Sequence, residues 1–151
     1  MHVHGGYQVG LVETCRAVFD LRPERRGDAL LVIATPGWIT GQSYMIAAAL
    51  LCAVPSVLLD GSPVAPPDRF AEVIARHRVS ILKAGSTFLR MVMTGGFETL
   101  LARHDLSCLR LGTFCACLAL LASLARFLRW AQAKFERGAA PRPVSYTHLR
   151  A

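Results

Sequence analysis

The chain has 151 residues, of which 53% are hydrophobic and 18% charged, so it is long enough for one domain with a buried core and too apolar for an intrinsically disordered protein. Its formal net charge is +7, but residues 1–119 carry 11 Lys and Arg against 9 Asp and Glu, whereas residues 120–151 carry 6 against 1. The body therefore lacks the basic patch with interleaved aromatic residues that a nucleic-acid interface needs, and we expect no nucleic-acid partner.

The cysteines are odd in number, scattered along the chain and free of any C-x-x-C pair: Cys15, Cys52, Cys108, Cys115 and Cys117. This pattern is typical of reduced thiols in a cytosolic protein rather than of a disulfide framework or a zinc site. The first ten residues lack the basic segment and apolar core of a secretory signal. We therefore expect a cytoplasmic protein without a metal site.

Three elements are predicted in the first third of the chain. Apolar residues recur at near-helical spacing from Gly6 to Phe19, which predicts a helix. The short apolar run at 29–34 predicts a buried strand. Residues 42–52 are rich in Ala and Leu and apolar all round, which predicts a buried helix that Pro55 ends.

The window from Ala29 to Leu59 contains no charged residue and is long enough to raise the question of a membrane span. Proline and glycine interrupt it at Pro36, Gly37 and Pro55. We therefore expect a strand, a loop, a helix and a second strand here, and no membrane helix.

The second half of the body continues the alternation of strands and helices. Strands are predicted at 56–60, 79–84 and 109–114. Asp68 stands at the N-cap position of a helix, and Ser86 caps another that runs to Met93. The apolar face of the first of these helices is formed by Phe70, Val73, Ile74 and His77.

Such alternation predicts an α/β fold, with a parallel sheet and helices packed on it. In these sheets ligands bind beyond the carboxyl ends of the strands. Four distinctive segments fall there: TPGWITG, GSPV, AGST and TFCA. Their convergence predicts a site for a small molecule.

The segments GWITGQSY, DGSPV, RFAEVIARHRVSILKAGSTFLRM and SCLRLGTFCA, in this order and spacing, resemble the acetyl-CoA synthetase group of the AMP-forming acyl-CoA ligases. The resemblance spans roughly residues 2–116. It implies that residues 1–116 are a partial AMP-dependent synthetase/ligase domain, a piece of the large N-terminal domain of the adenylate-forming enzymes. The parent enzyme would convert a short acid such as acetate or propionate to an acyl-adenylate and then to its CoA thioester, with ATP, CoA and Mg²⁺.

The resemblance also implies roles for individual residues. Trp38, Ile39, Thr40 and Cys115 match the acyl pocket, Thr40, Val64 and Gly85 the CoA side, and Ala116 the nucleotide site. The residues alone leave alternatives open, because Trp38 could be core packing and Cys115 an inert buried thiol. No catalytic residue of the family falls within the chain.

The family pattern stops after Ala116, where Cys117 and Leu118 replace the expected Glu-Pro. The phosphate-binding loop, the ribose-binding aspartate and the lid domain with its catalytic lysine are absent, so we expect the chain alone to be inactive. Residues 117–151 are interpreted as a non-family tail derived from a frameshift or an adaptor, or else as a genuine disordered tail.

The sequence also leaves two other functions open. Residues 117–137 could form a basic amphipathic helix, which would make the protein a small membrane-associated or interaction protein. The body could also be a non-catalytic α/β ligand-binding module.

Overall fold

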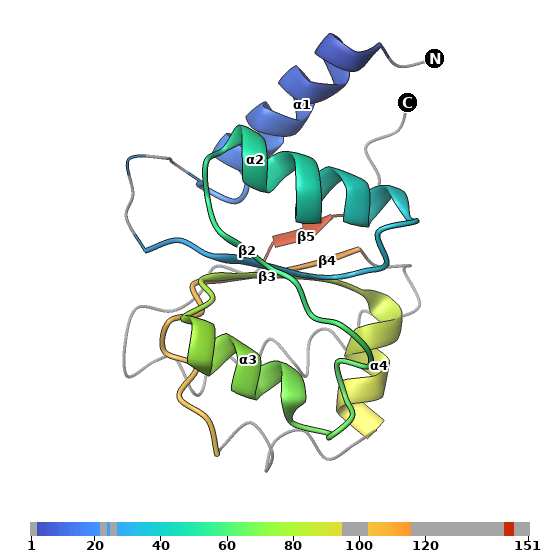
Figure 1. Cartoon of the computed structure of the whole chain (residues 1–151), viewed down its shortest axis with the longest axis vertical. Helices are drawn as coiled ribbons and strands as arrows, with labels where there is room; N and C mark the ends of the chain where they lie inside the picture. The colour runs from blue at the N-terminus through green and yellow to red at the C-terminus, as the bar shows by residue number, and fades with distance from the viewer. Residues whose placement is uncertain (1–2, 22–23, 25–26, 95–102, 116–143, 147–151) are drawn as a thin grey trace.

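A parallel sheet forms the middle of the chain's computed structural model (Figure 1), which describes residues 3–21, 24, 27–94, 103–115 and 144–146. The strand order is β2-β1-β3-β4-β5, and every neighbouring pair is parallel. The predicted α/β fold is confirmed. The strands are β1 (Leu30–Ile33), β2 (Ser56–Val57), β3 (Ile81–Gly85), β4 (Leu111–Cys115) and β5 (Val144–Tyr146). The helices are α1 (His4–Ala17), η1 (Gly41–Ala48), α2 (Ala49–Leu51), α3 (Arg69–His77) and α4 (Ser86–Thr94).

Helices cover both faces of the sheet. In Figure 1, α1 and the η1–α2 helix lie above the strands, whereas α3 and α4 lie below. Because side chains alternate along a strand, successive residues of β1 pack against the helices on one face of the sheet and then on the other. Leu30 and Val32 join the core on the α1 and η1 side. Leu31 joins the core on the α3 and α4 side. This two-sided burial explains why the strand reads as a continuous apolar run.

The helix predicted at 42–52 forms, but it is not buried all round. It begins as the π-helix η1 and continues as α2. Met45 and Ala48 are buried against the sheet, whereas Ile46 is 41% exposed and Leu50 is 76% exposed. The prediction of a fully buried helix was wrong, because the sheet and α1 pack against part of its surface and leave Ile46 and Leu50 exposed.

Helix α3 follows its predicted pattern with one exception. Phe70 and Ile74 are buried in the core between α3 and the sheet. His77, predicted on the same face, is exposed, because α3 ends there and Arg78 turns the backbone to a φ of 51°. Asp68 lies at the N-cap position, but its side chain accepts no hydrogen bond from the first turn.

The amino ends of three strands are joined by a buried polar cluster. The guanidinium of Arg110 donates to both carboxylate oxygens of Asp28, from Nε at 2.9 Å and from Nη2 at 2.8 Å. The hydroxyl of Ser80 donates to the same carboxylate at 2.8 Å. Arg110 also donates to the carbonyl oxygens of Phe19 and Asp20 at 2.9 and 3.1 Å. The cluster therefore ties the chain after α1 to the residues that precede β1, β3 and β4.

The strands differ from the predictions at the two edges of the sheet. Residues 56–60 were predicted as a strand, but β2 is only Ser56–Val57. At the other edge β5, which the sequence did not predict, pairs with β4 from Thr113 to Cys115. The rest of the predicted tail, residues 117–143 and 147–151, lies outside the described residues. Within the described part of the chain, no helix has the length and apolar character needed to cross a membrane.

Candidate functional site

Strands β1 and β3 form a switch point in the sheet. They are neighbours, with Leu31 paired to Leu82. The helix that follows β1 covers one face and the helix that follows β3 covers the other (Figure 1). Because helices that leave to opposite faces open a crevice between their connecting loops, ligands of parallel α/β sheets bind at such points. The predicted convergence of strand-end loops at one edge is confirmed by the parallel pairing of β1 to β4.

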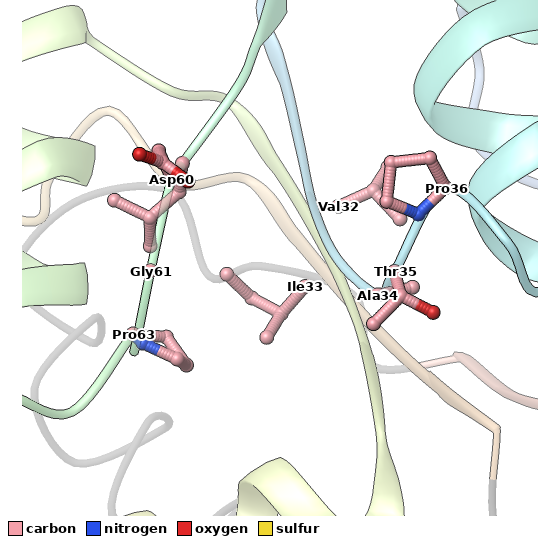
Figure 2. Close-up of a pocket in the computed structure, with 9 residues that line it drawn as sticks. Val32, Ile33, Ala34, Thr35, Pro36, Asp60, Gly61 and Pro63 are labelled. Carbon is pink, nitrogen blue, oxygen red and sulfur yellow. The ribbon is translucent and has the colours of Figure 1, made fainter.

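A cavity of about 370 Å³ lies at this edge, between the residues that follow β1 and β2. Figure 2 shows Ile33 between the Ala34–Pro36 side and the Asp60–Pro63 side. The volume is within the range of small-molecule sites, and most of the lining is apolar. Thr35 and Asp60 are the residues with polar side chains in the lining. The lining residues are Val32, Ile33, Ala34, Thr35, Pro36, Leu59, Asp60, Gly61 and Pro63.

Hydrogen bonds fasten the loop after β1 to the start of η1. The Trp38 amide donates to the Thr35 carbonyl at 3.0 Å, and the Gln42 amide donates to the Trp38 carbonyl at 3.1 Å. The side-chain amide of Gln42 also donates to the Pro36 carbonyl. The backbone that lines one side of the cavity is therefore part of the same hydrogen-bonded unit as the helix behind it.

Three of the four residues predicted for the acyl pocket lie on this loop but outside the cavity. Trp38 is 66% exposed and Ile39 is 61% exposed, and Thr40 is half-buried. None of the three lines the cavity between β1 and β2. The loop brings them to the carboxyl edge together, and their contact with an acid stays a prediction.

The other predicted site residues come from three different strand ends. Val64 is half-buried against the core on the α3 side, and Gly85 ends β3. Cys115 ends β4, paired with Gly85 in register. The Cys115 side chain and the whole of Ala116 lie outside what the structure describes. The CoA-side and nucleotide roles of these residues are likewise still predictions.

Buried polar groups occupy the α1 side of β3 and β4. Lys83 is 2% exposed, and its Nζ lies 4.4 Å from the ring centroid of Tyr44 and 5.5 Å from that of Phe19. Such cation–π contacts stabilise a desolvated ammonium group. Thr113 pairs with Lys83 in register, and its buried Oγ1 has no hydrogen-bond partner among the described residues.

No metal site emerges from the described residues, which contain no group of three or more His, Cys, Asp or Glu side chains placed to hold an ion. Sequence reasoning placed the segment with Thr35 and Pro36 at the site without naming these two residues, and it missed Asp60; all three line the cavity. The available signal was position: Thr35 and Pro36 directly follow the predicted strand 29–34, and Asp60 ends the predicted strand 56–60. The resemblance selects Trp38 and Thr40 instead, because these residues belong to the motif on which it rests.

Comparisons with known proteins agree with the resemblance. The family described as "AMP-binding enzyme" matches residues 1–137. An acetyl-coenzyme A synthetase of Deinococcus radiodurans is 40% identical over 111 residues, which are 73% of this chain and 16% of that protein. The enzyme of the same name from Pyrobaculum arsenaticum is 38% identical over 112 residues, 74% of this chain and 16% of its own length. Acetyl-coenzyme A synthetase 2 of Candida albicans is 32% identical over 111 residues, again 73% and 16%.

Two facts describe how far the similarity extends, in the relatives and along this chain. The chain spans about a sixth of the length of the curated relatives it matches. The family match runs on to residue 137, so it includes the segment 117–137 that was interpreted as non-family sequence and as a surface helix.

Proposed function

The chain belongs to the AMP-binding enzyme family, and we propose that it is the part of an AMP-forming acyl-CoA ligase that holds the acid and the CoA arm. The parent reaction joins a short carboxylic acid to ATP as an acyl-adenylate and then to CoA as a thioester. The observation that carries this proposal is the match to acetyl-coenzyme A synthetases over about three quarters of the chain. We expect acetate or propionate as the acid and the cytoplasm as the location.

In this proposal the loop after β1 carries the acyl side of the site. Trp38 and Ile39 supply apolar contact for the short alkyl group, and the Thr40 hydroxyl orients the acid. Val64 and Gly85 lie along the CoA arm. Two observations support these roles: the loop residues, Val64 and Gly85 lie towards the same edge of the sheet, and an apolar cavity lies at that edge. Cys115 and Ala116, which end β4 and follow it, complete the acyl and nucleotide sides.

The described residues do not supply the charges that adenylation needs. Forming the acyl-adenylate requires the phosphate oxygens of ATP to be held by hydrogen-bond donors and by Mg²⁺. Because the sequence contains no counterpart of the family's phosphate-binding loop, we propose that the ATP phosphates and Mg²⁺ are held by the remaining length of the parent enzyme, with Ala116 on the nucleotide side. We therefore expect no acetate-dependent release of pyrophosphate from the 151-residue chain alone.

A graft tests the proposal. Residues 2–115 of this chain replace the matched segment in the Deinococcus radiodurans acetyl-coenzyme A synthetase, and acetate-dependent pyrophosphate release and acetyl-CoA formation are measured. We expect activity well above that of the same enzyme with the segment deleted.

The matched control substitutes Trp38 with alanine in the graft, which removes apolar contact from the proposed acyl side. We expect the KM for acetate to rise. A correctly folded graft that makes no acyl-adenylate from acetate or propionate would contradict the proposal.

A further inference from the structure

Gly41 is the first residue of η1. It lies against the backbone of Thr35 and Pro36, in the loop that follows β1. A Cβ at this position would stand 2.9 Å from the Thr35 carbonyl carbon and 3.1 Å from Pro36 Cα, and closer still to the Thr35 carbonyl oxygen. Backbone atoms cannot rotate away as the end of a flexible side chain can. Only glycine therefore lets η1 begin this close to the strand-end loop.

The partners on the loop side are held in place by hydrogen bonds. The Thr35 carbonyl, which a methyl group at position 41 would meet, accepts the hydrogen bond from the Trp38 amide. The next carbonyl, that of Pro36, accepts from the side chain of Gln42. A methyl group at position 41 therefore cannot be accommodated by a peptide flip without breaking one of these bonds.

The helix side is held by burial. Met45 and Ala48 pack in the core between η1 and the sheet, and the Met45 carbonyl accepts a hydrogen bond from the Ser56 hydroxyl at 2.8 Å. Trp38 and Ile39, in contrast, are 66% and 61% exposed. Because the loop has less packing to lose than the helix, an added methyl group displaces the loop.

We propose that Gly41 is a positioning residue that fixes the loop after β1 against η1, and thereby sets both the width of the cavity and the place of the Trp38–Thr40 segment. Thr35 and Pro36, which the methyl group would push, line that cavity. This inference deepens the proposed function and rests on it for the identity of the substrate. It assigns to Gly41 the role of keeping the site wide enough for the acid.

The decisive variant is Gly41→Ala in the graft described above. Because η1 lies behind Thr35 and Pro36, a methyl group on η1 pushes these residues towards the opposite wall and narrows the cavity, so a larger acid loses more than a smaller one. We expect kcat/KM to fall with both acids, and the ratio of propionate to acetate to fall about tenfold or more, because one methylene group is worth about tenfold or more in an apolar pocket.

Gly37→Ala is the matched control. Gly37 lies in the same loop, and a Cβ there meets no atom within 4 Å. We expect this variant to keep the unsubstituted ratio of propionate to acetate. A loss that came only from misfolding would lower the rates with both acids equally, so an unchanged ratio in Gly41→Ala would overturn the proposal.

A second measurement uses the intact 151-residue chain and needs no activity. In a Trp130→Phe background Trp38 is the only tryptophan, and acrylamide quenching reports its surroundings. We expect Gly41→Ala to change the quenching constant and Gly37→Ala to leave it unchanged. Equal constants in the two variants would overturn the proposal. An inactive graft together with a changed constant would refute the proposed ligase function and leave the positioning role of Gly41 supported.

Discussion

Arg110 and Asp28 are 82 residues apart in the sequence and face each other in a two-bonded ion pair at the amino end of the sheet. The Asp28 side chain is 3% exposed and that of Arg110 is 29% exposed. The paired geometry matches the planar guanidinium to the carboxylate, which is the strongest arrangement such groups adopt.

Removing the cation should therefore leave an almost fully buried carboxylate with Ser80 as its remaining side-chain donor. We expect Arg110→Ala to lower the free energy of unfolding by about 3–5 kcal/mol, as for other buried pairs that lose one partner. Urea denaturation of the intact chain measures this. The control is Arg78→Gln, which breaks the Arg78–Asp105 pair, where both side chains are more than 60% exposed, and should cost less than about 1 kcal/mol. Equal losses in the two variants would contradict the expectation.

Replacing Thr113 with a hydrophobic residue of the same shape should stabilise the folded chain. Its Oγ1 is buried without a hydrogen-bond partner in the described part of the chain, and such a group costs about 1–3 kcal/mol. Thr113→Val keeps the shape and removes the hydroxyl, so we expect the free energy of unfolding to rise by about 1 kcal/mol. Ser80→Ala, which deletes a hydroxyl that does donate, should lower it. The idea fails if Thr113→Val destabilises the chain as much as Ser80→Ala does.

Asp68 should make the stability depend on acid pH. The hydrogen bond from His104, at 3.1 Å, is the main cause that lowers the pKa of the Asp68 carboxyl below its usual value. Because the folded pKa is the lower one, the stabilisation is complete above the unfolded pKa and is lost as the pH falls through the folded pKa.

Urea midpoints of the wild type and of Asp68→Asn, measured from neutral pH downwards, should converge in that acid range. His104→Gln should raise the pKa of Asp68 in a ¹³C NMR titration of the carboxyl carbons. A constant gap between the two midpoints across the acid range would count against the assignment.

Cys15 should resist alkylation until the chain unfolds. Burial is the main cause that raises the pKa of its thiol to about 12, and the neighbouring Cys52 adds to the shift. Since the thiolate is the nucleophile, iodoacetamide at pH 8 should label half-buried Cys108 before buried Cys15. Peptide mapping by mass spectrometry measures the order, with urea-unfolded protein as the control in which both react. Labelling of Cys15 first in the folded chain would be the contrary result.

Local patterns made much of the fold predictable. The run at 79–84 is a buried strand, offset by a residue or two from the observed β3, because a short apolar run is what two-sided burial requires. Helix α3 was found from Phe70 and Ile74, whose spacing places both on the buried face. The carboxyl-edge site followed from parallel pairing, which alternation of strands and helices implies.

Features that depend on distant or backbone contacts could not be predicted. No residue near Asp28 in the sequence indicates that Arg110 and Ser80 donate hydrogen bonds to it in the fold. The exposed side of the η1–α2 helix was missed at Leu50, because composition reports how apolar a helix is and not how many neighbours it has. The need for glycine at Gly41 depends on the Thr35 backbone six residues earlier, and no periodicity encodes such an approach.

The polar cluster of Asp28, Ser80 and Arg110 and the cavity beside Thr35 lie at opposite ends of the same strands. Substitutions in the strand-end loops therefore leave the fastening of the strands intact. Over evolutionary time, such a division lets the loops at one end of the sheet change in sequence while the other end preserves the fold.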